Sequence, residues 1–313
     1  MQSARSVLTP ESLAMLHAIA ELGSFAAAAR ALNVVPSALT YRVRQIEDAL
    51  DVLLFDRRSR QAVLTPAGNE LVHEGNRLLV EIDAVANRVK RVATGWETQL
   101  TIAVDGIVHR PTLMEMCEAF FALESPTRIK LRDESLSGTL QTLVTGQADL
   151  AIGVAADSST GPGLQSKPLG TVSFVFAVAP HHPLAGMQEP LGDALITRHR
   201  AVAVADSVHN ASAMTIGLLA GQDVFTVPDM AAKLDSQRRG LGAGFLPSAM
   251  VRHDVEAGRL IVKRVERTER VVRPSYAWRA TGRNPIGKAL QWWLQHLERP
   301  ATRAALLHQA AGV

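Results

Sequence analysis

Hydrophobic residues near the start of the chain recur at helical spacing, in runs separated by residues that start or stop helices. The first run, 10–22, follows the capping residue Thr9 and stops at Gly23. The second, the alanine-rich segment 25–32, follows Ser24, and its small side chains allow another helix to approach closely. Two short helices joined by a tight turn predict the beginning of a helix-turn-helix.

A third helix, beginning at Pro36, has two different faces. Apolar residues fall at intervals of four, three and four positions from Leu39 to Leu50, which makes one apolar stripe. The opposite face is short, hydrogen-bonding and basic, and it suits a DNA major groove. A solvated amphipathic helix would show the same two faces, so this helix alone does not establish DNA binding. The groove-facing residues would be Ser37, Thr40, Tyr41 and Arg44.

The segment 53–64 consists of two short apolar runs around a basic turn. Three arginines within four residues can contact phosphates or enter a narrow minor groove, although a solvated loop could carry them too. Together with the preceding helices, this pattern predicts a winged helix-turn-helix over residues 1–65. The wing contacts would come from Arg57, Arg58 and Arg60.

A long helix is expected after the wing, capped by Thr65 and assigned to residues 66–94. Uncharged positions recur along it at alternating intervals of four and three, the spacing of a coiled-coil seam. Packing against the same chain would give the same stripe, but seven positions without a charge favour a dimeric coiled coil. The dimerisation residues would be Leu71, Leu78, Ile82, Val85 and Val89.

Beyond residue 95, strand-like runs alternate with helical runs, which predicts an α/β fold with a largely parallel sheet covered by helices. A Gly/Ser-rich stretch, 158–163, divides this part into two lobes. We expect a two-lobed domain at 95–313, with lobe I at about 95–163 plus 266–300 and lobe II at about 164–265. The expected strands are 100–104, 128–133, 150–154, 172–178, 201–204, 224–227 and 274–278, and the expected helices are 111–123, 136–145, 230–239 and 284–298.

The composition is consistent with a DNA-binding part followed by a two-lobed α/β domain, but it does not establish either. The 313 residues suit two or three domains, and 47% hydrophobic with 20% charged residues is ordinary for a soluble globular protein. The formal charge of +3 is compatible with nucleic acid but small. One cysteine, Cys117, excludes an intramolecular disulfide. With no apolar run of signal-peptide or membrane-spanning length, a cytoplasmic location is expected.

One stretch near the end of the chain is strongly basic. Residues 252–283 carry nine Lys/Arg and four Asp/Glu, a local charge of +5. The stretch could line an anion site or form a solvated face, and the solvated face is favoured.

Two other classes of protein were weighed against a regulator. An enzyme is disfavoured because His181 and His182, as neighbours on a strand, point to opposite faces, and because 240–244 lacks the spacing of a nucleotide loop. We therefore expect no catalysis, metal or cofactor. A transport solute-binding protein would explain the last two thirds of the chain, but not the first ninety residues or the missing leader.

Four motifs, in order and spacing, resemble the LysR-type transcriptional regulators. They are Gly23-Ser24-Phe25, Pro36-Ser37-Ala38-Leu39-Thr40, Leu54-Phe55-Asp56-Arg57 and Leu64-Thr65-Pro66-Ala67-Gly68. The resemblance implies a winged helix-turn-helix, a dimerising linker helix and an effector domain like the periplasmic solute-binding proteins. The chain departs from the family at Val35 and Pro36, where a small hydroxyl residue and a glutamine are usual.

The resemblance also assigns binding residues. It carries DNA contacts onto the third helix and the wing, and it adds Pro36 and a phosphate contact at Arg42. Segments 150–153, 168–170, 182–185 and 227–230 are similar to the branch that controls allantoin and purine-nitrogen use. The implied effector is a ureide, a small carboxylate or an aromatic acid, and the implied assembly is a homodimer or homotetramer on double-stranded DNA. The effector contacts would be Asp105, Gly106, Ile107, Ser135, Ser137, Ala205, Asp206, Ser207, Pro228 and Asp229.

Overall fold

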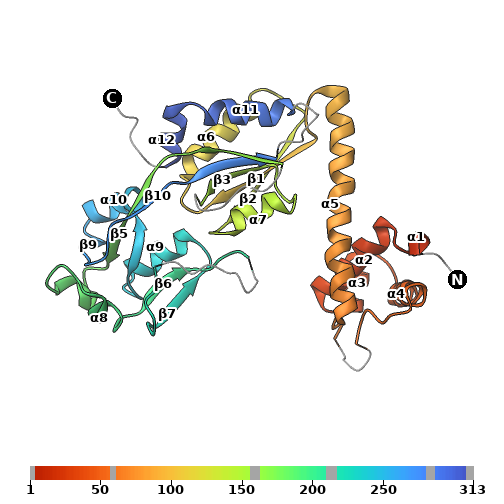
Figure 1. The fold of residues 1–313 in the computed structure, drawn as a ribbon, viewed down its shortest axis with the longest axis horizontal. Helices are drawn as coiled ribbons and strands as arrows, with labels where there is room; N and C mark the ends of the chain where they lie inside the picture. Colours follow the sequence, from red (N-terminus) through yellow and green to blue (C-terminus); the bar gives the residue numbers. More distant parts are fainter. Residues whose placement is uncertain (1–3, 57–60, 156–162, 209–216, 280–285, 308–313) are drawn as a thin grey trace. The chain divides into compact units, whose positions relative to one another are not determined.

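The computed structural model describes residues 4–56, 61–155, 163–208, 217–279 and 286–307 (Figure 1). These form two compact units, Met1–Val89 and Lys90–Val313. The three arginines predicted for the wing, Arg57, Arg58 and Arg60, lie outside the described residues.

The first unit begins with four helices whose ends are set by local capping. Thr9 accepts a hydrogen bond from the Ser12 N–H at 3.3 Å, and the helix it caps ends at Gly23, which has a φ of 60°. Ser24 caps the next helix through the Ala27 N–H at 3.4 Å. The predicted helix starts are therefore confirmed. The helices are α1 (Ala4–Val7), α2 (Pro10–Leu22), α3 (Phe25–Ala31) and α4 (Pro36–Leu50).

The core of this unit lies between α2, α3 and α4. Ala28 and Ala29 are fully buried, which confirms the close helix approach expected of the alanine-rich segment. Phe25 packs edge-to-face on Phe55 with ring centroids 5.2 Å apart. Three residues of the predicted apolar stripe of α4, Leu39, Val43 and Ile46, are buried, whereas Leu50 is partly buried. Glu47 is buried beside them.

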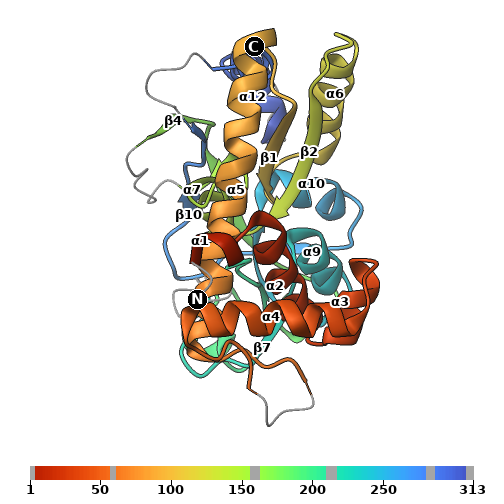
Figure 2. The same cartoon turned by 90° about the vertical axis from the view of Figure 1, so that its right-hand side faces the viewer.

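The described residues at the base of the predicted wing pair less extensively than the two strands of a regular β-hairpin. Their pairing is a single antiparallel bridge between Phe55 and Leu64, next to which the Thr65 N–H donates to the Leu54 carbonyl at 2.9 Å. The long helix α5 (Pro66–Thr94) then begins against this bridge. A Cβ on Gly68 would lie 2.1 Å from the Leu54 carbonyl oxygen, so only glycine fits there. α4 runs crosswise to the start of α5 (Figures 1 and 2).

Lobe I of the second unit is a five-stranded sheet in the order β2-β1-β3-β11-β4. The first three strands are parallel, as predicted, and β11 pairs antiparallel with β3 on one side and with β4 on the other. Helices α6, α11 and α12 pack on one face of the sheet around Phe120 and Trp293, and α7 packs on the other (Figure 1). The strands are β1 (Gln99–Asp105), β2 (Arg128–Glu134), β3 (Leu150–Val154), β4 (Leu164–Pro168) and β11 (Ser275–Arg279); the helices are α6 (Arg110–Phe121), α7 (Gly138–Val144), α11 (Lys288–Leu297) and α12 (Pro300–Leu306).

Lobe II is built around β5 (Val172–Val178), which pairs antiparallel with three strands. Those strands are β8 (Gly244–Pro247), β9 (Ile261–Lys263) and β10 (Arg270–Val272). A separate parallel pair, β6 (Ala201–Val204) and β7 (Val224–Val227), joins this sheet through a bridge between Ala201 and Ala243. The helices are α8 (Asp193–Ile196), α9 (Met230–Arg238) and α10 (Ser248–Glu256), with a 3-10 turn at Pro183–Gly186.

The predicted lobe boundaries need correction. β4 was expected in lobe II but pairs with β11 in the lobe I sheet, and β10 was expected in lobe I but pairs with β5. Both strands are joined by pairing between segments far apart in the chain, which local periodicity does not encode. The last predicted helix starts at Lys288 instead of residue 284, because its first N–H donates to the Gly95 carbonyl and the Glu97 carboxylate accepts the next two, those of Ala289 and Leu290.

Candidate nucleic-acid interface and inter-lobe site

The polar face of α4 is fully open to solvent. Tyr41 is 63% exposed, whereas Leu39 and Ile46 on the opposite face are 2% and 1% exposed. Val35 occupies the N-cap without a side-chain hydrogen bond, and Pro36 holds the first helical position, as the sequence predicted. All the candidate groove and phosphate residues of α4 are exposed: Pro36, Ser37, Thr40, Tyr41, Arg42 and Arg44.

Glu47 is a residue that sequence reasoning missed. Its side chain is buried at 6% exposure, and its Oε1 accepts the backbone N–H groups of Leu54 at 2.8 Å and Phe55 at 3.4 Å. Glu47 therefore ties the second half of α4 to the strand that enters the wing. The only signal in the sequence is an acidic residue beside the apolar stripe, directly after Ile46.

The structure divides the predicted α5 seam into two parts. Leu71 packs against the core of the first unit, and a Cβ on Gly75 would lie 2.9 Å from Leu13 Cδ2, so this part of α5 is held by its own chain. The seam residues available to a partner start at Leu78. Their exposed fractions are 50% for Leu78, 47% for Ile82, 46% for Val85 and 65% for Val89.

Four of the predicted effector residues meet between the lobes. The Ser137 hydroxyl of lobe I donates to Asp206 Oδ2 of lobe II at 2.5 Å. The Ser135 N–H donates to Ser207 Oγ at 3.0 Å, and the Ser207 hydroxyl donates back to the Ser135 carbonyl at 3.1 Å. These residues therefore form a polar contact that closes the lobes directly on each other. A Cβ on Gly138 would lie 1.8 Å from Ser207 Oγ, so any other residue there would displace the Ser207 hydroxyl from this contact.

Asp105 lies next to this contact and stabilises two loops of lobe I. Its carboxylate is 8% exposed and accepts the backbone N–H groups of Ile107 at 3.0 Å and Leu136 at 3.1 Å. Burial raises the pKa of Asp105 to about 6, its hydrogen bonds oppose that rise, and the nearby Asp206 charge adds to it. Asp105 thus orders both loops of lobe I that face lobe II.

The other predicted effector residues make contacts within their own lobe, except Gly106, which lies against Met230 of lobe II. Asp229 caps α9 by accepting the Ala232 N–H at 2.7 Å. The Ala205 N–H donates to the Val227 carbonyl at 2.8 Å, and a Cβ on Gly106 would lie 3.1 Å from Met230 Cβ. Ile107 is buried and Pro228 is exposed. These five border the inter-lobe contact without contributing a side chain to its hydrogen bonds.

The residues raised by the enzyme alternative also have local roles. His182 Nδ1 accepts the Leu184 N–H at 3.2 Å, whereas His181 Nε2 lies 3.2 Å from the Arg239 carbonyl oxygen. Cys117 is part of the lobe I core. Within the described ranges, no three His, Cys, Asp or Glu side chains are grouped so as to hold a metal. Every helix in the same ranges is too short or too polar to cross a membrane.

Comparison with known proteins gives matches to both parts of the chain. Residues 10–69 match the bacterial regulatory helix-turn-helix proteins of the lysR family, and residues 93–301 match the LysR substrate binding domain. The uncharacterized HTH-type transcriptional regulator YeeY of Escherichia coli (strain K12) is 34% identical over 281 residues, covering 90% of each chain. The HTH-type transcriptional activator AllS of Klebsiella pneumoniae is 32% identical over 257 residues, covering 82% of this chain and 95% of AllS.

Among solved structures, full-length CbnR complexed with its target DNA has a similar fold. The TM-score is 0.58 at 18% identity, and the match covers 93% of this chain and 99% of CbnR.

Proposed function

Because the chain belongs to the LysR family of DNA-binding transcriptional regulators, we propose that it reads operator DNA with the exposed face of α4 and responds to a small molecule bound between lobes I and II. Residues 1–65 bind DNA, 66–94 join two copies of the chain, and 95–313 bind the effector. The protein acts in the cytoplasm as a homodimer or homotetramer and catalyses no reaction.

The observation that carries this proposal is the exposed polar face of α4. Ser37, Thr40, Tyr41 and Arg44 fall within about 100° of one another around a helix of 3.6 residues per turn, and all four are exposed. Hydroxyl, phenol and guanidinium groups are suited to base edges in a major groove. Arg42 lies away from this arc and suits a phosphate. CbnR, which shares the fold, has been solved with its target DNA.

Two neighbouring substitutions on α4 separate base reading from phosphate contact. Tyr41→Ala is expected to weaken operator binding by about tenfold to a hundredfold and to leave binding to random DNA nearly unchanged. Arg42→Ala is expected to weaken binding to both DNAs and to lower the slope of log affinity against log salt by about one. Fluorescence anisotropy with upstream promoter DNA and with a shuffled duplex, over a salt series, measures both effects.

Equal loss on both duplexes for both variants would contradict this division of roles. Loss of binding in neither variant would contradict the assignment of α4 as the reading helix. Thermal unfolding of each variant serves as the control for folding, because both side chains are exposed and their removal leaves the core intact.

The inter-lobe contact favours one effector class over the others. A ligand that enters between the lobes replaces the Ser137 hydroxyl at the Asp206 carboxylate and the Ser207 hydroxyl at the Ser135 N–H. It must therefore offer a donor to Asp206 and an acceptor to Ser135. A ureide carries both groups side by side, whereas a bare carboxylate would face the negative charge of Asp206. We therefore favour a ureide over a small carboxylate or an aromatic acid at this site.

The ligand preference is testable by thermal shift of the full chain. Allantoin, as the ureide probe, is expected to raise the unfolding temperature, and benzoate at the same concentration is expected to raise it less. Asp206→Ala is expected to abolish the allantoin shift, with Asp235→Ala, which removes a half-exposed carboxylate of α9 outside the assigned effector contacts, as the matched control. A larger, Asp206-dependent shift with benzoate would overturn the preference for a ureide.

A further inference from the structure

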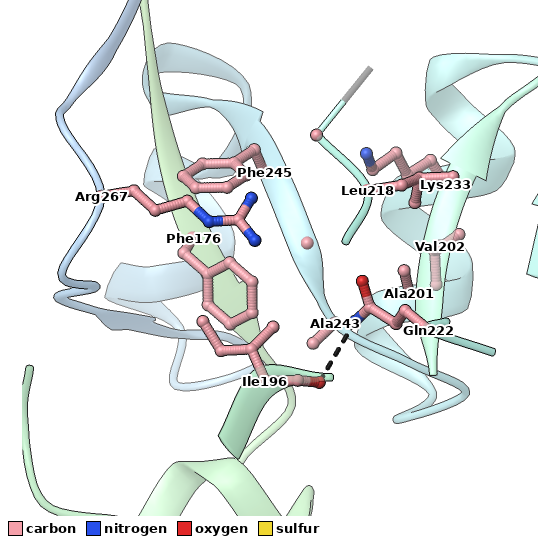
Figure 3. Close-up of a pocket in the computed structure, with 12 residues that line it drawn as sticks. Phe176, Ile196, Ala201, Val202, Leu218, Gln222, Lys233, Ala243, Phe245 and Arg267 are labelled. Carbon is pink, nitrogen blue, oxygen red and sulfur yellow. Dashed lines mark hydrogen bonds between the residues drawn. The ribbon is translucent and has the colours of Figure 1, made fainter. Parts of the chain in front are cut away.

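The hollow that lobe II forms between β5, β8 and α9 is too small to hold an effector (Figure 3). It is lined by residues that include Phe176, Phe245, Lys233 and Arg267, and its free space accommodates about one water molecule. Apolar side chains that are open to a partner lie instead in the first unit, at the start of α4.

The turn that leads into α4 ends in two exposed apolar residues, Val35 and Pro36. Val35 is 63% exposed, more than any other leucine, isoleucine or valine that the structure describes before α5. Backbone hydrogen bonds order this turn. The Val34 N–H donates to the Ala29 carbonyl at 2.9 Å, and the Ala38 N–H donates to the Val35 carbonyl at 3.0 Å. The chain therefore holds two side chains without hydrogen-bonding groups in solvent, at the edge of the proposed reading face.

Thr40 continues this apolar edge by one turn of the helix. It lies four residues after Pro36, about 40° farther around α4, so the two side chains are neighbours. The Thr40 Oγ1 donates to the Pro36 carbonyl at 3.1 Å, and the residue is exposed. Because the backbone engages the hydroxyl proton, the Thr40 side chain offers a partner its methyl group and its oxygen lone pairs, but no donor.

We propose that Val35, Pro36 and Thr40 read the 5-methyl group of a thymine in each operator half-site, an inference that rests on the proposed reading of DNA by α4. Thymine presents a methyl group in the major groove, and apolar side chains and the threonine methyl group are suited to contact it. Ser37, Tyr41 and Arg44 lie on the other side of Thr40 from Pro36 around the helix. The start of α4 thus selects an apolar group, whereas the rest of its reading face selects hydrogen-bonding base edges.

The test uses the full chain and a duplex that it selects from a randomised library, compared with a shuffled duplex of the same composition. Each thymine is replaced in turn by deoxyuridine in both half-sites, which removes the methyl group and leaves the hydrogen-bonding groups of the base unchanged. Fluorescence anisotropy at constant salt measures the affinity. At one thymine position, the replacement is expected to weaken binding about threefold to tenfold, the effect of losing a buried methyl contact.

Two substitutions of Thr40 separate its methyl group from its hydroxyl. Thr40→Ser removes the methyl group, and it is expected to weaken binding to the thymine duplex by a similar factor and to reduce the further loss on deoxyuridine replacement. Thr40→Val removes the hydroxyl, and it is expected to retain the affinity within about twofold together with the deoxyuridine effect. Thr145→Ser is the matched control, because Thr145 of lobe I is also exposed and also donates to the carbonyl four residues earlier, at 2.9 Å.

Val35→Ser gives a result that a purely structural role would not give. Val35 is the N-cap of α4 and makes no side-chain hydrogen bond there, whereas serine is a preferred N-cap residue. The variant is therefore expected to unfold at an equal or higher temperature. Its operator affinity is nevertheless expected to fall about threefold to tenfold, because the apolar contact is lost.

Three results would overturn the proposal. If deoxyuridine has no effect at any thymine of a duplex that the chain still prefers over the shuffled one, thymine reading is refuted and the proposed function stands. If Thr40→Val loses as much affinity as Thr40→Ser, the hydroxyl and not the methyl group reads the base. If the chain binds the selected and shuffled duplexes equally, or selects none, the proposed function is refuted and this inference with it.

Discussion

Replacing Ile82 with aspartate is expected to convert the protein into monomers and to lower its operator affinity by a hundredfold or more. Ile82 lies at the centre of the exposed seam of α5 and is 47% exposed in the single chain. An aspartate there would bury a carboxylate against an apolar partner surface in the dimer. Two linked reading helices gain about 10² to 10⁴ in affinity from effective concentration, and this gain is lost with the dimer.

The measurement is light scattering for mass and fluorescence anisotropy for operator binding. Ile82→Leu keeps an apolar side chain and serves as the matched control, with expected retention of both dimer and affinity. Because Ile82 makes no contribution to the core of the first unit, the aspartate variant should retain the unfolding temperature of that unit. A dimeric Ile82→Asp with unchanged affinity would exclude this seam as the interface.

Glu47→Ala is expected to lower the free energy of unfolding of the first unit by about 2 to 4 kcal/mol, because two buried N–H groups lose their acceptor. Such a loss is large for so small a core, and operator affinity should fall with the folded fraction. Glu47→Gln keeps an oxygen acceptor at the same place and should lose only about 1 kcal/mol.

Hydrogen exchange of residues 10–56 within the full chain measures this effect locally. Protection should fall in Glu47→Ala and be largely retained in Glu47→Gln, whereas lobe I and lobe II should exchange as in the wild type. If alanine and glutamine behave alike, the two backbone hydrogen bonds to Glu47 do not hold α4 to the wing.

Elements with strong local signals could be predicted from the sequence. Capping residues such as Thr9 and Ser24 fixed where α2 and α3 begin, and continuous apolar runs located β3, β5 and β6 to the residue. The strands that the sequence pattern did not reveal are short or polar. β4 consists of Leu164–Pro168 and has an exposed, polar centre, so its place is set only by its partner β11.

The candidate sites show the same limit. The exposed face of α4 follows from helical periodicity alone, because the same pattern determines both its faces. Glu47 and Lys233 are polar residues buried by tertiary contacts, and α9 buries Lys233, Ser236 and Gln237, which no hydrophobic pattern predicts. The basic stretch 252–283 was interpreted as a solvated face; this is right for Arg264 but wrong for Arg267 and Arg270, which are partly buried around Phe174 and Phe176.

The tight packing at Gly68 and Gly75 has a mechanical consequence. The first turns of α5 pack closely against Leu54 and Leu13 at these glycines. We therefore expect them to move with α4 as one rigid body. Any adjustment of the distance between two operator half-sites must therefore arise farther along α5 or in the residues that follow it. A glycine-to-alanine change at position 68, where the added methyl would lie 2.1 Å from the Leu54 carbonyl oxygen, would displace the start of α5 from the helix-turn-helix and change the spacing of the two reading helices in the dimer.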